Sequence, residues 1–346
     1  MTKKIFLAFP GFEVGVEKIE KLSTVKLFNL NSISEADFIN LINKEIKPFN
    51  KNVVRNNKND FAKLEFKKSY SSSNWGISLP IYGKESSLAG IYEARYLMKL
   101  FSGSPLPVMF SVGSMGVDVR KTGISTLEKA MFHGEDKNFF NNDFLSFYKI
   151  LFPIIQKSGW DAIAVAKWSL EDWRLCAACV VFDDLEKYYR SKRMMTWQSE
   201  CADLASFYEM LFSRRKNDGG IYKITQRLSV LLGNSFSPQM KKDLSLLYNY
   251  RNEFVHGSFF ERLKRSTKTY PDDNNMAQLP NLDYKFLSEQ ANLARKIFII
   301  YLYLVKKLSK GRLAGQSVSQ IIHDGIMDVK SRKQIQKYAN EILTKM

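Results

Sequence analysis

Three polar side chains near the end of one amphipathic segment have types and spacing that suit a phosphate ligand. They are Arg251, Asn252 and His256, within residues 246–257, which read LLYNYRNEFVHG. Asn252 and His256 are four residues apart and share one face of a helix. Arg251 points about 140° away from His256 around the helix axis, but its long stem can bring the guanidinium group to the same side. A permanently charged fork, an amide and an imidazole together can bind a phosphate and move a proton.

The residues around this group predict the helix that carries it. Ser237 is a good N-cap, and Pro238 suits the first helical position. Gly257 suits the left-handed conformation that ends many helices. An apolar stripe at helical spacing lies between them, formed by Leu244, Leu247, Tyr248, Phe254 and Val255. The sequence thus predicts a helix over 238–256 with the polar group at its end. Spacing alone leaves a purely structural role for Arg251 and His256 open.

The motif Arg-Asn-x-x-x-His followed by Gly resembles that of HEPN domains, in particular the Apea-like HEPN group. Residues 207–212, FYEMLF, are similar to the first helix of that family, where a Glu precedes Leu-Phe. Residues 224–232, ITQRLSVLL, are similar to its second helix, where an Arg precedes a short aliphatic run. Residues 286–307 are similar to its long fourth helix. The resemblance covers about residues 195–310 and rests on four pieces in the family's order.

The resemblance implies a metal-independent endoribonuclease without a cofactor. Two copies of such a domain commonly pair, so that their motifs face each other across a cleft. Arg251, Asn252 and His256 match the family's catalytic positions. Three further residues match supporting positions of the family: Glu209, Arg227 and Tyr248. The simplest role for Glu209 and Arg227 is a buried ion pair with each other. Many HEPN nucleases belong to phage defence by abortive infection or to toxin systems, and the resemblance extends that context to this chain.

A second interpretation comes from the same family. HEPN domains can also be non-catalytic helical modules that dimerise or bind nucleic acid or nucleotides, in which case His256 is a structural helix-end residue. The presence of both Arg251 and His256, with Asn252 between them, favours the nuclease. A DNA-binding regulator fits less well, because no helix-turn-helix or zinc-module pattern stands out.

The charge of the chain favours a polyanionic partner. The formal net charge is +17, and residues 199–346 carry 24 Lys and Arg against 14 Asp and Glu. Such an excess suits nucleic acid or an anionic surface and says nothing about fold. Two stretches are candidate RNA-binding surfaces. The first interleaves basic with aromatic residues and contains Lys187, Arg190, Lys192 and Arg193, although a solvated helix end would also explain this pattern. The second follows His256 and contains Arg262, Lys264 and Arg265.

The order of the elements predicts an α+β chain with three parts. Residues 1–160 form a mixed α/β region with a sensor or regulatory role left open, 161–197 a helical connection, and 198–346 an all-α HEPN-like bundle. Strands are expected at 4–9, 53–55, 62–66, 77–82 and 108–112, and helices at 34–46 and 87–100. In the last part, helices are expected at 201–212, 222–234, 238–256 and 283–309. One or two more are expected in 318–345, with four exposed basic residues: Lys330, Arg332, Lys333 and Lys337.

Other candidate sites are weaker. The three cysteines are too few for a disulfide framework, and Cys176 and Cys179 lack the second pair that a zinc site needs. No cluster of His or carboxylate residues has the spacing of metal ligands. His323 is expected to be a helix-end residue, because no other candidate catalytic residue lies near it in the sequence. The longest apolar run, residues 297–305, is far shorter than a membrane span. We therefore expect a soluble cytoplasmic protein with no membrane partner and no metal.

Overall fold

The computed structural model describes residues 4–10, 26–29, 35–45, 74–80, 110–112, 117–119, 196–213, 220–256, 284–308 and 316–344, and nine single positions between 148 and 181. The chain divides into two compact units, Met1–Lys167 with Met346, and Trp168–Lys345. The three-part division expected from the sequence stays a prediction. None of the described helices has the length and apolar character that crossing a membrane requires.

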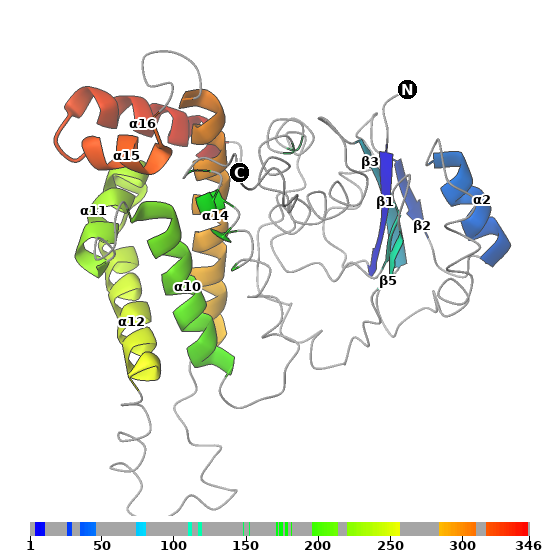
Figure 1. Ribbon diagram of the computed structural model, residues 1–346, viewed down its shortest axis with the longest axis horizontal. Helices are drawn as coiled ribbons and strands as arrows, with labels where there is room; N and C mark the ends of the chain where they lie inside the picture. The colour runs from blue at the N-terminus through cyan, green and yellow to red at the C-terminus, as the bar shows by residue number, and fades with distance from the viewer. Residues whose placement is uncertain are drawn as a thin grey trace, which may run out of the picture. The chain divides into compact units, whose positions relative to one another are not determined.

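The first unit contains a five-stranded antiparallel sheet in the order β2-β3-β1-β4-β5 (Figure 1). Its strands are β1 (Lys4–Pro10), β2 (Lys26–Asn29), β3 (Asn74–Pro80), β4 (Phe110–Val112) and β5 (Val117–Val119). The central strand β1 pairs with β3 from Lys4 opposite Pro80 to Pro10 opposite Asn74. Both prolines thus lie at strand ends, where a missing N–H disturbs the ladder least.

Burial shows where this sheet is covered. Ser78 and Leu79 of β3 are both buried, at 1% and 0% exposure. Because successive strand side chains point to opposite faces, β3 is covered on both faces at this point. The helix α2 (Glu35–Glu45) contacts β1 and buries Ile42.

The described elements of the first unit match several expected ones. The strands expected at 4–9, 77–82 and 108–112 overlap β1, β3 and β4, and the helix expected at 34–46 is α2. The strands β2 and β5 were not expected from the sequence, because they have only four and three residues and therefore show little alternation. The strands expected at 53–55 and 62–66 and the helix at 87–100 lie outside the described residues. The mixed α/β class of residues 1–160 stays a prediction.

All regular elements described in the second unit are helical (Figure 1). They are α10 (Thr196–Phe212), α11 (Ile221–Leu232), the short 3₁₀ helix η1 (Gly233–Ser235), α12 (Pro238–Val255), α14 (Tyr284–Leu308), α15 (Val318–Asp324) and α16 (Val329–Leu343). The five expected helical segments of this half are therefore confirmed within a few residues at their ends. The last expected segment is divided into α15 and α16 by a turn at 325–328.

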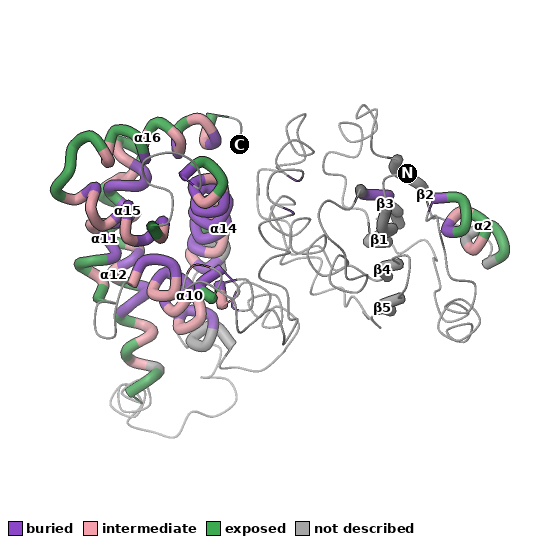
Figure 2. The backbone as a smooth tube through the Cα atoms, turned by 45° about the horizontal axis from the view of Figure 1, so that its top comes forward, coloured by how far each residue is buried: buried purple, intermediate pink, exposed green. Residues whose placement is uncertain are grey.

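The core of this unit lies between α10 and α14. The helix α10 packs against α12 and α14, and α16 packs against α11 and α14. Two edge-to-face aromatic pairs join α10 to α14, with ring centroids 5.6 Å apart for Phe207 and Phe298 and 6.1 Å apart for Phe212 and Tyr301. Figure 2 shows α14 buried along much of its length.

Two buried arginines bind consecutive carbonyl groups at the C-terminal end of α10. Arg227 of α11 has 0% exposure and donates to the Phe212 carbonyl at 2.7 Å. Arg174 donates to the Ser213 carbonyl at 2.5 Å and to the hydroxyl group of Ser319 on α15. The last carbonyls of a helix have no partner within it and carry partial negative charge. The two guanidinium groups satisfy them and attach α11 and α15 to this helix end.

A second contact of Arg227 joins α11 to α15. Its Nη2 atom lies 3.2 Å from Nδ1 of His323. A guanidinium group can only donate, so Nδ1 must accept, and the imidazole carries its single proton on Nε2. His323 lies in the last turn of α15, which confirms its interpretation as a helix-end residue.

Two glycines allow α11 to approach the α15–α16 hairpin closely. Gly233, which ends α11, has a φ of 53° that glycine tolerates best, and a Cβ there would lie 3.0 Å from the Gln336 side chain. A Cβ on Gly325 would lie 2.8 Å from Cγ1 of Val230. A larger residue at position 325 would therefore force α15 away from α11.

One of the four exposed basic residues expected in the tail has a structural role. Arg332 is only partly exposed, and its Nε donates to the Gly325 carbonyl at 2.7 Å while Nη2 donates to the Ile326 carbonyl. It stabilises the turn between α15 and α16, a role that depends on the fold and not on local spacing. Lys330, Lys333 and Lys337 are exposed as predicted.

We predict that Arg227→Met lowers the free energy of unfolding by about 2 to 4 kcal/mol, because the Phe212 carbonyl loses a charged donor in a buried site. Urea unfolding followed by circular dichroism measures the change. The matched control is Lys242→Met, which makes the same kind of substitution at an exposed position of α12 and should change stability by less than about 0.5 kcal/mol. Equal stabilities for the two variants would contradict the capping role.

Candidate functional site

The helix α12 carries the three candidate catalytic residues and begins as the sequence predicts. The hydroxyl group of Ser237 accepts a hydrogen bond from the Met240 backbone N–H at 3.1 Å, so Ser237 is the N-cap, and Pro238 is the first helical residue. Leu244, Leu247 and Tyr248 are buried at 5% exposure or less. These side chains hold the middle of α12 against the bundle.

The last turn of α12 leaves the core. Arg251 is partly exposed, Asn252 and His256 are exposed, and Val255 is 54% exposed. The prediction that Val255 belongs to the buried apolar stripe is therefore wrong, because its side chain is mostly exposed. The side chain of Phe254 and the residue Gly257 lie outside the described part. The C-terminal end of α12 lies beside the start of α14, where the Tyr250 and Phe286 rings meet edge to face at 6.4 Å.

A hydrogen bond connects two of the three candidate residues. Nη1 of Arg251 donates to Oδ1 of Asn252 at 2.9 Å. The guanidinium group therefore swings toward the face that Asn252 shares with His256, as its long stem was expected to permit. Because the carboxamide oxygen is occupied, the amide N–H groups of Asn252 are oriented away from it and can donate to a ligand. The backbone N–H of His256 bonds to the Asn252 carbonyl at 3.0 Å, which keeps the two residues one helical turn apart.

The supporting residues Tyr248 and Glu209 lie together between α12 and α10. The hydroxyl group of Tyr248 lies 3.3 Å from the Ala205 carbonyl and also within hydrogen-bonding reach of the Glu209 carboxylate. Burial, and then the Glu209 charge, raise the pKa of Tyr248, while the nearby Arg251 lowers it. Tyr248 therefore keeps its proton at neutral pH and joins α12 to α10. It positions the helix that carries Arg251.

The third supporting residue, Arg227, lies apart from this group. Among the described residues its guanidinium group contacts the Phe212 carbonyl and His323, as described above, and no ion pair with Glu209 is present. The expected Glu209–Arg227 pair is therefore wrong. The physical reason is that the free carbonyl groups at the end of α10 compete for the guanidinium group, and no local sequence pattern reveals them.

The remaining candidates are outside the described residues or are buried. The expected RNA-binding residues Lys187, Arg190, Lys192, Arg193, Arg262, Lys264 and Arg265 all lie outside, as do Cys176 and Cys179. Cys201 is buried, and burial raises the pKa of its thiol. In the part of the chain that is described, no three or more His, Cys, Asp or Glu side chains are grouped to hold a metal ion.

Comparisons with known proteins give no relative. No family model matches the chain, and no curated protein and no solved structure matches it either. The resemblance to HEPN domains therefore rests on the residues themselves.

We predict that the protein loses stability as the pH rises above about 9, first through Cys201 and above about pH 10 through the buried tyrosines as well. Burial raises the pKa of Tyr208, Tyr248 and Tyr301 above 10.0 and that of Cys201 above 9.0. The unfolded chain releases these protons first, so it binds fewer protons than the native state, and each group contributes a slope that approaches about −1.4 kcal/mol per pH unit. Urea unfolding from about pH 8 to about pH 11 measures this slope.

Two phenylalanine variants form a matched pair for this experiment. The Tyr208 hydroxyl is buried without a hydrogen-bond partner among the described residues, so Tyr208→Phe should keep or raise the stability at pH 8. Tyr248→Phe removes the donor to Ala205 or Glu209 and should lower it by about 1 kcal/mol. Both variants should flatten the alkaline slope, and an unchanged slope in both would contradict the assignment.

Proposed function

We propose that this chain is a metal-independent endoribonuclease that uses Arg251, Asn252 and His256 at the end of α12. The observation that supports it most is the hydrogen bond from Arg251 to Asn252 on an exposed helix end, beside an exposed His256. These three side chains contribute little to the core, so their polar atoms can bind a ligand. The resemblance of the motif to HEPN domains supplies the reaction class and favours a role in phage defence by abortive infection or in a toxin system.

The chemistry of RNA cleavage suits these side chains. The ribose 2′-hydroxyl attacks the adjacent phosphorus, a cyclic phosphate forms, and the bond to the 5′-oxygen breaks. The imidazole of His256 can accept the 2′-hydroxyl proton or donate a proton to the leaving 5′-oxygen. The guanidinium group of Arg251 stabilises the negative charge that develops on the phosphate oxygens. The amide N–H groups of Asn252 orient the phosphate or the imidazole.

One copy of the motif supplies a single imidazole, whereas the reaction needs both a base and an acid. A symmetric dimer repeats each contact, so two copies of the α12 end can meet and provide two imidazoles. The exposure of Asn252, Val255 and His256 supports this arrangement, because a partner subunit can cover this end of the helix.

We predict that His256→Ala lowers the rate of RNA cleavage on the order of 10² to 10⁴-fold, because the proton-transfer group is lost. Arg251→Ala should cost on the order of 3 kcal/mol in the transition state, or about 100-fold in rate. Arg251→Lys should also fail, since an ammonium group lacks the planar fork. Purified protein is incubated with total cellular RNA in EDTA, and the cut ends are mapped.

The control for this series is Leu246→Ala, a substitution at an exposed position of the same helix, away from its last turn, that removes no polar group. It should cleave at the wild-type rate, and all variants should share the wild-type unfolding midpoint and filter-binding affinity. Wild-type cleavage by His256→Ala would overturn the nuclease and favour a non-catalytic helical module. Loss of activity in EDTA, restored by a divalent ion while the RNA stays folded, would overturn metal independence.

We predict that the active protein is a homodimer that joins through residues 198–310. Light scattering at the assay concentration should give about twice the mass of the chain, which is 40.0 kDa. Mixing His256→Ala with the wild-type protein tests whether the subunits share a site, because a mixed dimer has only one imidazole in a shared cleft and should lose activity, whereas independent sites would keep about half of it. A fully active monomer at that concentration would exclude the shared cleft.

A further inference from the structure

One exposed face of α16 carries a cluster of positive charge. Its apolar residues Ile335, Ala339 and Ile342 are buried, and the helix packs with α11 and α14. Three exposed lysines at spacings of three and four residues share the opposite face: Lys330, Lys333 and Lys337. This lysine face contributes nothing to the core, so the fold does not explain its charge.

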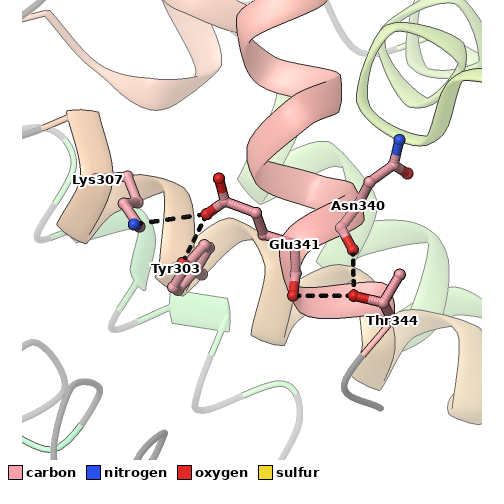
Figure 3. A network of polar contacts seen from close by, with 5 residues as sticks. All are labelled: Tyr303, Lys307, Asn340, Glu341 and Thr344. Atoms are coloured by element: carbon pink, nitrogen blue, oxygen red, sulfur yellow. Dashed lines mark hydrogen bonds and ion pairs between the residues drawn. The ribbon is translucent and has the colours of Figure 1, made fainter.

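The acidic residues near the lysine face are committed to other contacts. Glu341, the one carboxylate within α16, binds Lys307 of α14 at 3.5 Å and accepts a hydrogen bond from the Tyr303 hydroxyl at 3.0 Å (Figure 3). Asp328 caps α16 and bonds to the Lys330 and Ser331 backbone N–H groups, so it offsets only the first lysine in part. In the described part of the chain, no carboxylate pairs with Lys333 or Lys337.

The chemistry of this face selects among polyanionic partners. A helix that lies in a membrane surface buries an apolar side in the lipid, but the apolar side of α16 is already used by the core. Met327 and Val329 are exposed at 88% and 54%, yet the charged Asp328 stands between them. The face itself offers ammonium groups together with the exposed amides Gln334 and Asn340. These groups suit phosphates in water and not acyl chains.

We infer that the lysine face of α16 binds the phosphate backbone of a nucleic acid. The rise of about 1.5 Å per residue spreads the three lysines over about 10 Å along α16, and one strand of a duplex carries about three phosphates over about 10 Å of the duplex axis. Such contacts hold the backbone without reading its sequence. The inference does not rest on the proposed nuclease and holds whether or not the chain cleaves RNA.

The position of this face gives it a distinct role. Within the second unit, α16 and the C-terminal end of α12 lie at opposite ends of the helical bundle (Figures 1 and 2). The α16 face therefore grips a nucleic acid at a distance from Arg251 and His256. It adds affinity for a nucleic acid long enough to reach α16. It adds none for an oligonucleotide that contacts only the C-terminal end of α12.

The test replaces the three lysines by glutamine in the full-length protein: Lys330→Gln, Lys333→Gln and Lys337→Gln together. Duplex DNA is the probe, because it has no 2′-hydroxyl and cannot be cut by the proposed reaction. Affinity should fall on the order of 10- to 100-fold at physiological salt, and the slope of log affinity against log salt should become shallower by about 2 to 3. The unfolding midpoint should stay the same, because these side chains are exposed.

A second triple variant separates this face from total charge. Lys223→Gln, Lys241→Gln and Lys242→Gln remove the same number of charges from exposed positions on α11 and α12, and should lower the affinity far less. Equal losses in the two triples would overturn the inference in favour of diffuse attraction. Unchanged DNA binding by the α16 variant would also overturn it, and so would loss of binding only to phosphatidylserine vesicles, which would assign the face to membranes.

Discussion

The geometry of the second unit depends on the charged side chains that are buried at the end of α10. Moving a guanidinium group out of water is expensive unless its N–H groups find acceptors. The C-terminal carbonyls of α10 are such acceptors, and their partial negative charge favours a cation. Arg174 and Arg227 bind the two consecutive carbonyls of Ser213 and Phe212, and each also contacts α15. The end of α10 thus determines the positions of α11 and α15, because each guanidinium group needs acceptors on two elements to offset the cost of its burial.

The orientation of the candidate site on α12 depends on the position of α10. The helix α12 packs along α10 through buried leucines and through Tyr248, whose hydroxyl group lies between Ala205 and Glu209. Once α10 is fixed, the direction in which α12 emerges from the bundle is fixed too. The last turn of α12 leaves the core, and there the polar side chains of Arg251, Asn252 and His256 are partly or fully exposed. Arg251 and Asn252 bind each other on this turn, so the exposed end is ordered without being buried.

The sequence predicted those features that depend on local pattern. The periodicity of apolar residues located α11, α12 and α14 within a few residues, and the N-cap at Ser237 was correct. Features that depend on distant residues were missed. The partners of Arg227 and Arg174 lie 96 and 145 residues away along the chain at His323 and Ser319, and no spacing rule reaches so far. Val255 was misplaced for the same reason, because its exposure depends on where neighbouring helices stop. The roles of Arg251, Asn252 and His256 stay predictions, since geometry alone does not show a reaction.

The positive charges of this unit fall into two physical classes. Arg174 and Arg227 are buried, and Arg332 binds the turn at Gly325, so removing any of them disturbs the fold. Lys330, Lys333, Lys337 and Arg251 keep their charge in contact with water, where it adds little to stability. An exposed cluster of like charges even costs a little through mutual repulsion, so its presence is better explained by an anionic partner than by folding. The two classes therefore have different effects when they are removed. The loss of a buried arginine lowers both the stability of the fold and the binding of a partner, whereas the loss of an exposed cation affects only the interaction with the anionic partner.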